Sequence, residues 1–178
     1  MKVIKRSGQE VEFDLSKIET LIDKRALRRF RERAMNNSEA TTRGTAQNDD
    51  IYFQATEVRN KYYDEIPNVV NSYMEKINNI ANTDYKPFNY YGSDKAKKVI
   101  VAMGSVTETI KEVIDDLNEE IGLIIVRLYR HFSKEYFMNV LPDTVEKVAV
   151  LDRTKEFGAE GPLYLDVCSI LKDTNIKV

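Results

Sequence analysis

The side chains that most often carry out chemistry are scarce in this sequence. It contains one histidine, His131, and one cysteine, Cys168. Because serine and cysteine nucleophiles are usually activated by a histidine base, such a site would have to use His131. This residue follows Tyr129-Arg130 at the end of a predicted strand, where ligand sites of parallel sheets are found. No nucleophile with a partner carboxylate stands at a suitable spacing, so we interpret His131 as a surface residue.

Cys168 lies in an apolar stretch between Val167 and Ile170, which is typical of a small buried hydrophobic residue. With one cysteine the chain cannot form an internal disulfide. A zinc or iron–sulfur site within one chain would need several cysteines or histidines, so the composition argues strongly against one. We therefore predict no metal ligands in this chain.

Gly104-Ser105 stands where a predicted strand meets a predicted helix. In doubly wound sheets this position can hold a phosphate at the helix N-terminus. The further glycines of a dinucleotide site and the Gly-Lys-Ser/Thr of a P-loop are missing. A tight turn followed by an ordinary helix cap is therefore the preferred interpretation.

Two groups of charged residues could serve as binding surfaces. Carboxylate pairs occur at Asp115-Asp116 and Glu119-Glu120, and we interpret them as solvated charge on a surface helix. A basic cluster could bind anions or nucleic acid, but no aromatic stacking residues accompany it, which favours a solvated helix face. The cluster consists of Lys24, Arg25, Arg28, Arg29, Arg31 and Arg33.

The overall composition is that of an ordinary globular protein. The 178 residues are 42% hydrophobic and 31% charged, and 27 basic residues nearly balance 29 acidic ones. This balance argues against a nucleic-acid-binding protein or an acidic disordered tail. The first residues lack the apolar stretch of a signal peptide, and no apolar run is long enough to span a membrane. We therefore expect a soluble, cytoplasmic chain of about one domain.

The elements that would position these residues are clearest from residue 98 onward. Apolar runs at 99–103, 123–129 and 148–151 predict three buried strands. Helical patterns at 105–117, 133–141 and 163–171 follow these strands, and Ser105 with Glu108 forms a capping box. Strands that alternate with helices imply a parallel sheet with right-handed crossovers. The predicted fold class is therefore α/β, a three-layer βαβαβ parallel sheet preceded by a β-hairpin and helices.

The first half of the chain gives a less regular pattern. Residues 2–14 predict two short strands around a turn, and Ser16 with Glu19 predicts the start of a helix. Residues 36–50 resemble a loop, whereas 55–80 is helical, with Pro67 in a first turn. Residues 82–97 are predicted to be a connector because Pro87 and Gly92 punctuate them. These physical patterns alone define no active site.

Several motifs nevertheless resemble pyruvate:ferredoxin (flavodoxin) oxidoreductases, over about residues 21–172. The strongest is Arg43-Gly44-Thr45-Ala46-Gln47-Asn48, followed by Asp50-Ile51-Tyr52-Phe53-Gln54. The others, in the same order as in the family, are Val101-Ala102-Met103-Gly104-Ser105-Val106, Val126-Arg127-Leu128-Tyr129-Arg130 and Leu151-Asp152-Arg153-Thr154-Lys155-Glu156. The resemblance implies that residues 23–97 form the end of the first domain. It also implies that 98–178 are core domain II, C-terminally truncated and similar to the transketolase C-terminal domain.

The family resemblance also implies an activity for the parent enzyme, the oxidative decarboxylation of pyruvate to acetyl-CoA. That enzyme is implied to be a dimer that uses thiamine pyrophosphate, magnesium, iron–sulfur clusters and CoA. The family's cofactor-binding and catalytic residues lie outside the matched stretch, so we assign no catalytic, cofactor-binding or metal-binding residue here. The chain is expected to be a fragment that is not catalytic alone. Its expected partners are the remaining domains or subunits, or a second copy, with no nucleic acid or membrane, and they would cover an open sheet edge.

Residues 1–22 resemble a different family, the start of an ATP-cone of anaerobic ribonucleotide reductase. The resemblance covers Met1 to Asp14 and Ser16-Lys17-Ile18. It implies that Lys5 and Arg6 contact nucleotide phosphates. The alternative function is therefore an ATP-cone-like, nucleotide-binding regulatory module.

Overall fold

The computed structural model describes residues 2–4, 10–12, 23–34, 38, 47–117 and 119–178. The chain divides into two compact units. The first comprises residues 1–59 and 76–83, and the second comprises 60–75 and 84–178. Two of the three boundaries fall within long helices, α3 (Asp49–Tyr63) and α4 (Ile66–Ala81), and the third follows α4.

The first unit contains the predicted N-terminal hairpin. Strands β1 (Lys2–Ile4) and β2 (Glu10–Glu12) pair antiparallel, with Val3 opposite Val11. Helix α2 (Lys24–Glu32) begins after Asp23, whose carboxylate accepts hydrogen bonds from two backbone N–H groups of the first turn. The capping box predicted at Ser16 and Glu19 lies outside the described residues.

The second unit is built on a four-stranded sheet of order β3-β5-β4-β6. Its strands are β3 (Phe88–Gly92), β4 (Lys98–Ala102), β5 (Ile121–Val126) and β6 (Lys147–Val150). The last three are parallel, which confirms the predicted core. The segment 82–97 is not the simple connector that we predicted, because β3 pairs antiparallel with β5 at the sheet edge. The aromatic residues Phe88, Tyr90 and Tyr91 favour a strand, despite Pro87 before it and Gly92 at its end.

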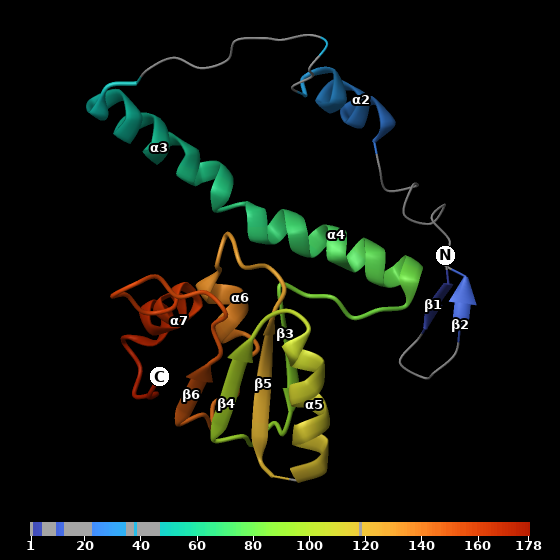
Figure 1. The fold of residues 1–178 in the computed structure, drawn as a ribbon, viewed down its shortest axis with the longest axis vertical. Helices are drawn as coiled ribbons and strands as arrows, with labels where there is room; N and C mark the ends of the chain where they lie inside the picture. Colours follow the sequence, from blue (N-terminus) through green and yellow to red (C-terminus); the bar gives the residue numbers. More distant parts are fainter. Residues whose placement is uncertain (1, 5–9, 13–22, 35–37, 39–46, 118) are drawn as a thin grey trace. The chain divides into compact units, whose positions relative to one another are not determined.

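Helices cover both faces of this sheet, as expected for three layers (Figure 1). Helix α5 (Val106–Leu117) packs on β5 and β3 on one face, where Ile110, Ile114 and Leu123 are buried. Helices α6 (Lys134–Met138) and α7 (Pro162–Leu171) belong to the larger core on the other face. Phe88 and Phe137 meet edge to face there, with ring centroids 5.6 Å apart.

The start of α7 depends on an aspartate that is distant in sequence. One carboxylate oxygen of Asp152, Oδ2, accepts hydrogen bonds from the N–H groups of Leu163 at 2.6 Å and Tyr164 at 3.3 Å. Gly161 itself offers no side chain to cap the helix. An added Cβ at Gly161 would lie 2.7 Å from the Cβ of Asp152, so a glycine is needed for this approach. The carboxylate satisfies helix N–H groups that would otherwise lack partners.

The outer edge of β6 is partly covered by the chain's own C-terminal residues. The Val148 N–H donates to the Lys177 carbonyl at 2.7 Å, and the Lys177 N–H donates to the Glu146 carbonyl at 3.0 Å. Part of the edge that we expected a partner to cover is therefore paired within the chain. Within the described residues, the helices are all too short or too polar to cross a membrane.

Candidate polar pocket beside the edge strand

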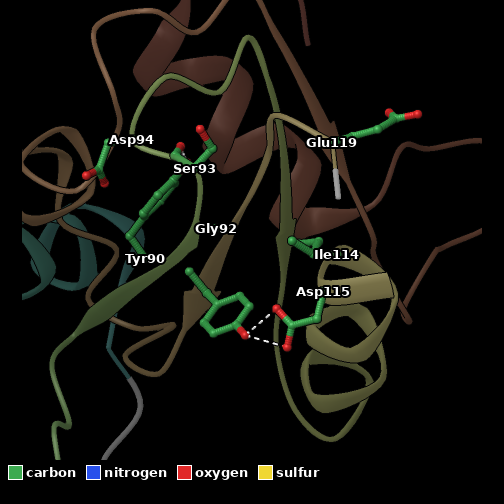
Figure 2. Close-up of a pocket in the computed structure, with 8 residues that line it drawn as sticks. Tyr90, Gly92, Ser93, Asp94, Ile114, Asp115 and Glu119 are labelled. Atoms are coloured by element: carbon green, nitrogen blue, oxygen red, sulfur yellow. Dashed lines mark hydrogen bonds between the residues drawn. The ribbon is translucent and has the colours of Figure 1, made fainter. Parts of the chain in front are cut away.

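The second unit has an open pocket of about 600 Å³ between β3, the turn that follows it and the C-terminal part of α5 (Figure 2). Most of its lining residues are tyrosines or carry a carboxylate. They are Tyr90, Tyr91, Gly92, Ser93, Asp94, Ile114, Asp115 and Glu119. The pocket therefore combines hydrogen-bonding phenols with negative charge.

Tyr91 joins the edge strand to the helix. Its hydroxyl lies 2.6 Å from Oδ1 and 2.7 Å from Oδ2 of Asp115, so the phenol donates to the carboxylate (Figure 2). Asp115 is exposed to solvent, as predicted, but it also accepts this hydrogen bond, which the sequence did not predict. Helix geometry places Asp115 on the side of α5 that faces β3, and this contact between residues 24 positions apart could not be inferred from local spacing.

Tyr90 is held on the opposite face of the same strand. Its hydroxyl donates to the Ser93 carbonyl at 2.5 Å. Burial, together with the negative charge of Asp94, raises the pKa of Tyr90 to about 12. This phenol therefore keeps its proton at all ordinary pH values. It acts as a hydrogen-bond donor that stabilises the turn and not as a general base.

Lys111 is a buried cation next to this pocket. Its side chain is only 8% exposed, and its ammonium group lies 2.8 Å from Oε1 of Glu108. The same group lies 5.7 Å from the centre of the Tyr91 ring, within the range of a cation–π contact. The buried charge is thus compensated by one carboxylate and one aromatic ring.

The pocket does not fit a phosphorylated cofactor such as thiamine pyrophosphate or CoA. Asp94, Asp115 and Glu119 all line it, and their negative charges would repel a pyrophosphate. The one hydroxyl nucleophile in the lining, Ser93, accepts a hydrogen bond from the Lys95 N–H at 3.2 Å and has no histidine beside it among the lining residues. A cationic group or a hydrogen-bond donor is the ligand that this lining would accept.

The residues singled out from the sequence lie elsewhere and do not form one site. His131 is half-buried in the loop after β5 and does not line this pocket. Gly104 has a positive φ of 80° in the turn after β4, and its carbonyl accepts a hydrogen bond from the Thr107 hydroxyl at 2.7 Å. This is the tight turn that we preferred over a phosphate site.

The other candidates are equally dispersed. Cys168 is half-buried on α7, and a hydrogen bond to it raises the pKa of Tyr164 one turn earlier. The basic cluster lies on the exposed helix α2, where Arg28 pairs with Glu32 at 2.8 Å. Lys5 and Arg6, predicted to contact nucleotide, lie outside the described residues. The described part of the chain contains no group of three or more potential metal ligands placed to hold an ion.

Sequence reasoning missed most of the pocket. Tyr90, Tyr91, Ser93 and Asp94 fall in the segment that we took for a connector. The available signal was the aromatic-rich run of residues 88–91 before Gly92, which is typical of a strand that ends at a turn.

A mixed, open sheet with helices on both faces defines a core α/β domain consistent with the transketolase-like class. Comparisons with known proteins identify the family to which this domain is similar. Residues 96–178 match the family model of pyruvate:ferredoxin oxidoreductase core domain II. This segment of the chain therefore belongs to the pyruvate:ferredoxin (flavodoxin) oxidoreductase family, as core domain II.

The similarity to individual relatives extends over most of the chain. The chain is 48% identical over 166 residues to pyruvate-flavodoxin oxidoreductase of Enterobacter agglomerans, which covers 90% of this chain and 14% of the relative. It is 47% identical over 164 residues to the enzyme of Klebsiella pneumoniae, covering 89% and 14%. With pyruvate:ferredoxin oxidoreductase of Moorella thermoacetica it shares 45% identity over 157 residues, covering 86% and 13%.

These matches confirm the family resemblance and leave the ATP-cone alternative without support. The chain corresponds to a small part of each relative, 14% of the first two. The relatives are accordingly much larger proteins, with further segments beyond the matched region.

Proposed function

We propose that this chain serves as a structural segment of a pyruvate:ferredoxin or pyruvate-flavodoxin oxidoreductase and does not catalyse the reaction alone. The observation that carries the proposal is the 48% identity over 166 residues to one such enzyme, of which the chain spans 14%. The well-packed core of the second unit, with Phe88, Phe137 and Leu163 essentially inaccessible to solvent, supports a structural role.

In this proposal, thiamine pyrophosphate, magnesium, iron–sulfur clusters and CoA are held by other parts of the enzyme. Two features of the chain support this assignment. The acidic pocket beside β3 repels pyrophosphate, and cluster ligation requires several cysteines, whereas the chain has only Cys168. What this chain supplies is a rigid α/β layer against which those parts can be held.

The proposed organisation follows the family. Residues 98–178 form core domain II, 23–97 correspond to the end of the first oxidoreductase domain, and 1–22 precede them. The match that begins at residue 96 supports the first of these boundaries. Strand β3, which starts at Phe88, joins the same sheet before that boundary. The proposed partners are the remaining domains or subunits, and the cytoplasmic location stays a prediction.

Two assays test this proposal. The purified 178-residue chain should show no pyruvate-dependent reduction of ferredoxin or methyl viologen, and turnover by the chain alone would contradict the proposal. In the second assay, the chain replaces the matched segment of the Klebsiella pneumoniae enzyme. We expect this chimera to retain pyruvate-dependent viologen reduction.

A matched control makes the chimera informative. The same chimera carrying Phe137→Ala should lose activity on mild heating before the parent chimera does, because the substitution leaves a cavity in the core. An inactive parent chimera, made with a chain that folds normally by circular dichroism, would refute the structural assignment.

A further inference from the structure

Helix α5 carries more apolar surface than its own sheet buries. Ile110 and Ile114 are buried, 8% and 7% exposed, whereas Val106, Val113 and Leu117 are 42%, 48% and 52% exposed. The three exposed residues follow the spacing i, i+7, i+11, which places them on one stripe within about 40° of arc. We call Val106, Val113 and Leu117 the lateral stripe.

The contacts of α5 show the direction in which this stripe points. On the helix, Lys111 and Asp115 lie roughly opposite the lateral stripe. Asp115 bonds Tyr91 of β3, and Lys111 lies against the same ring, so that side of the helix faces the β3 edge. With the buried side facing the sheet, the lateral stripe must face the other way, towards β4 and β6.

The half of the sheet that lies in this direction is incompletely covered. Helix α5 lies over β5 and β3, on the side away from β6 (Figure 1). On the same face Ile100 of β4 is half-buried, its neighbour Ala149 of β6 is exposed, and Leu151 after β6 is 46% exposed. The alternation of the strands places these three side chains on the α5 face, because Val148 and Val150 belong to the core of the opposite face.

One end of this surface carries positive charge. Lys98 and Lys147 are direct neighbours on β4 and β6, and both are exposed on the same face. Neither ammonium group forms an ion pair with another residue that the structure describes. Two like charges opposite each other on neighbouring strands repel, so carboxylates placed beside them would stabilise the pair.

We propose that the lateral stripe of α5 and the open part of β4 and β6 form the docking surface for an amphipathic helix. The lateral stripe forms one side of this surface, and the exposed face of β4 and β6 forms its base. A helix lying against both would complete the layer that α5 only half covers. Its apolar stripe would contact Ala149 and Val113, and its acidic end would approach Lys98 and Lys147.

The occupant to which we assign this surface is a helix from the remaining part of the oxidoreductase. This step rests on the proposed function. It is supported by the 14% of each relative that the chain spans, because the remaining part of those enzymes must contact this segment somewhere. Charge complementarity with the lysine pair specifies the helix as one with carboxylates at one end.

Cysteine accessibility tests the proposal in the chimera described above. Ala149→Cys reports on the docking surface, and Leu165→Cys is the matched control, because Leu165 is 50% exposed on α7. Alkylation of each introduced thiol is followed by peptide mass spectrometry in the isolated chain and in the chimera. We expect the thiol at position 149 to react about tenfold more slowly in the chimera, because a covered thiol reacts only through local opening. The thiol at position 165 should change less.

Variants of Lys98 and Lys147 provide a second test of the proposal. In the chimera that carries Ala149→Cys, Lys98→Glu with Lys147→Glu should restore fast alkylation of the introduced thiol. By contrast, Lys95→Glu, on an exposed residue of a turn, should not restore it. Restoration by both variants, or by neither, would overturn the acidic-helix assignment.

The remaining outcomes are also decisive. Fast alkylation at position 149 in an active chimera overturns the docking surface and leaves the proposed function intact. An inactive chimera overturns the proposed function, and the docking assignment falls with it. Protection of position 149 in the isolated chain that grows with protein concentration would identify the occupant as a second copy and would equally overturn the assignment.

Discussion

The contact between Asp152 and Gly161 allows a sharp test of how the loop after β6 holds α7. Replacing Gly161 by alanine adds one methyl group in a backbone conformation, φ −66° and ψ 140°, that alanine adopts without strain. The cost must therefore come from contact with Asp152. The new Cβ would lie 2.7 Å from both Cβ and Cγ of that residue, which forces the carboxylate away from the helix N-terminus.

The size of the effect follows from the hydrogen bonds that are lost. Asp152 accepts from Leu163 at 2.6 Å and from Tyr164 at 3.3 Å, and a charged acceptor at a helix N-terminus contributes about 2 kcal/mol. We expect Asp152→Ala to lower the free energy of unfolding by about that amount. Gly161→Ala should lower it by about 3 kcal/mol, because overpacking adds to the lost cap.

The double variant distinguishes this reasoning from two unrelated defects. Since the cap can be lost only once, Asp152→Ala with Gly161→Ala should fall short of the additive loss by about 2 kcal/mol. Urea unfolding followed by tyrosine fluorescence measures these changes, because the chain has no tryptophan and ten tyrosines. Additivity within about 0.5 kcal/mol would refute the proposed coupling between the two residues.

Three further predictions concern the core and the pocket. The free energy of unfolding should fall between about pH 10 and 12, because an unfolded tyrosine ionises near pH 10 whereas burial and Asp94 hold the pKa of folded Tyr90 at about 12. Tyr90→Phe should reduce this loss in urea titrations at several pH values, and an unchanged pH dependence would contradict it. Phe137→Ala should lower the free energy of unfolding by about 3–5 kcal/mol in the same assay, since the ring is fully buried. Lys111→Met should change it by less than about 1 kcal/mol, because an apolar side chain of similar length replaces a buried ammonium group and leaves Glu108, whose side chain is 63% exposed, in contact with water. A loss above about 2 kcal/mol would show that the ion pair is a net stabiliser.

The parallel strands could be predicted because each is an unbroken apolar run. Strand β5 (Ile121–Val126) is almost wholly buried, so nearly all of its residues are apolar and the run is visible in the sequence. Strand β3 was missed because it is an edge strand of mixed polarity, and because Pro87 before it and Gly92 at its end are residues typical of turns. The side chains of β3 are mostly only partly buried, so a strand of five residues gives a weak hydrophobic pattern.

The pocket could not be predicted for a different reason. Its main contact joins Tyr91 to Asp115, and the α7 cap joins Asp152 to Leu163. Such pairs depend on which face of an element meets which strand, and hydrophobic periodicity does not determine this. The family was accessible because motifs in a fixed order carry information that periodicity lacks.

The sequence pattern of α5 was correct, but its meaning changed once the sheet was known. The helical pattern at 105–117 includes Val106, Ile110, Val113, Ile114 and Leu117, yet the sheet buries only the two isoleucines among them. A helix packed on one surface needs an apolar stripe of limited width, and extra width indicates a second surface. Because Val106, Val113 and Leu117 point away from β3, this extra apolar surface faces the half of the sheet that α5 does not cover. The wide apolar stripe of α5 is therefore best explained by a second helix that packs beside α5 on the part of the sheet formed by β4 and β6.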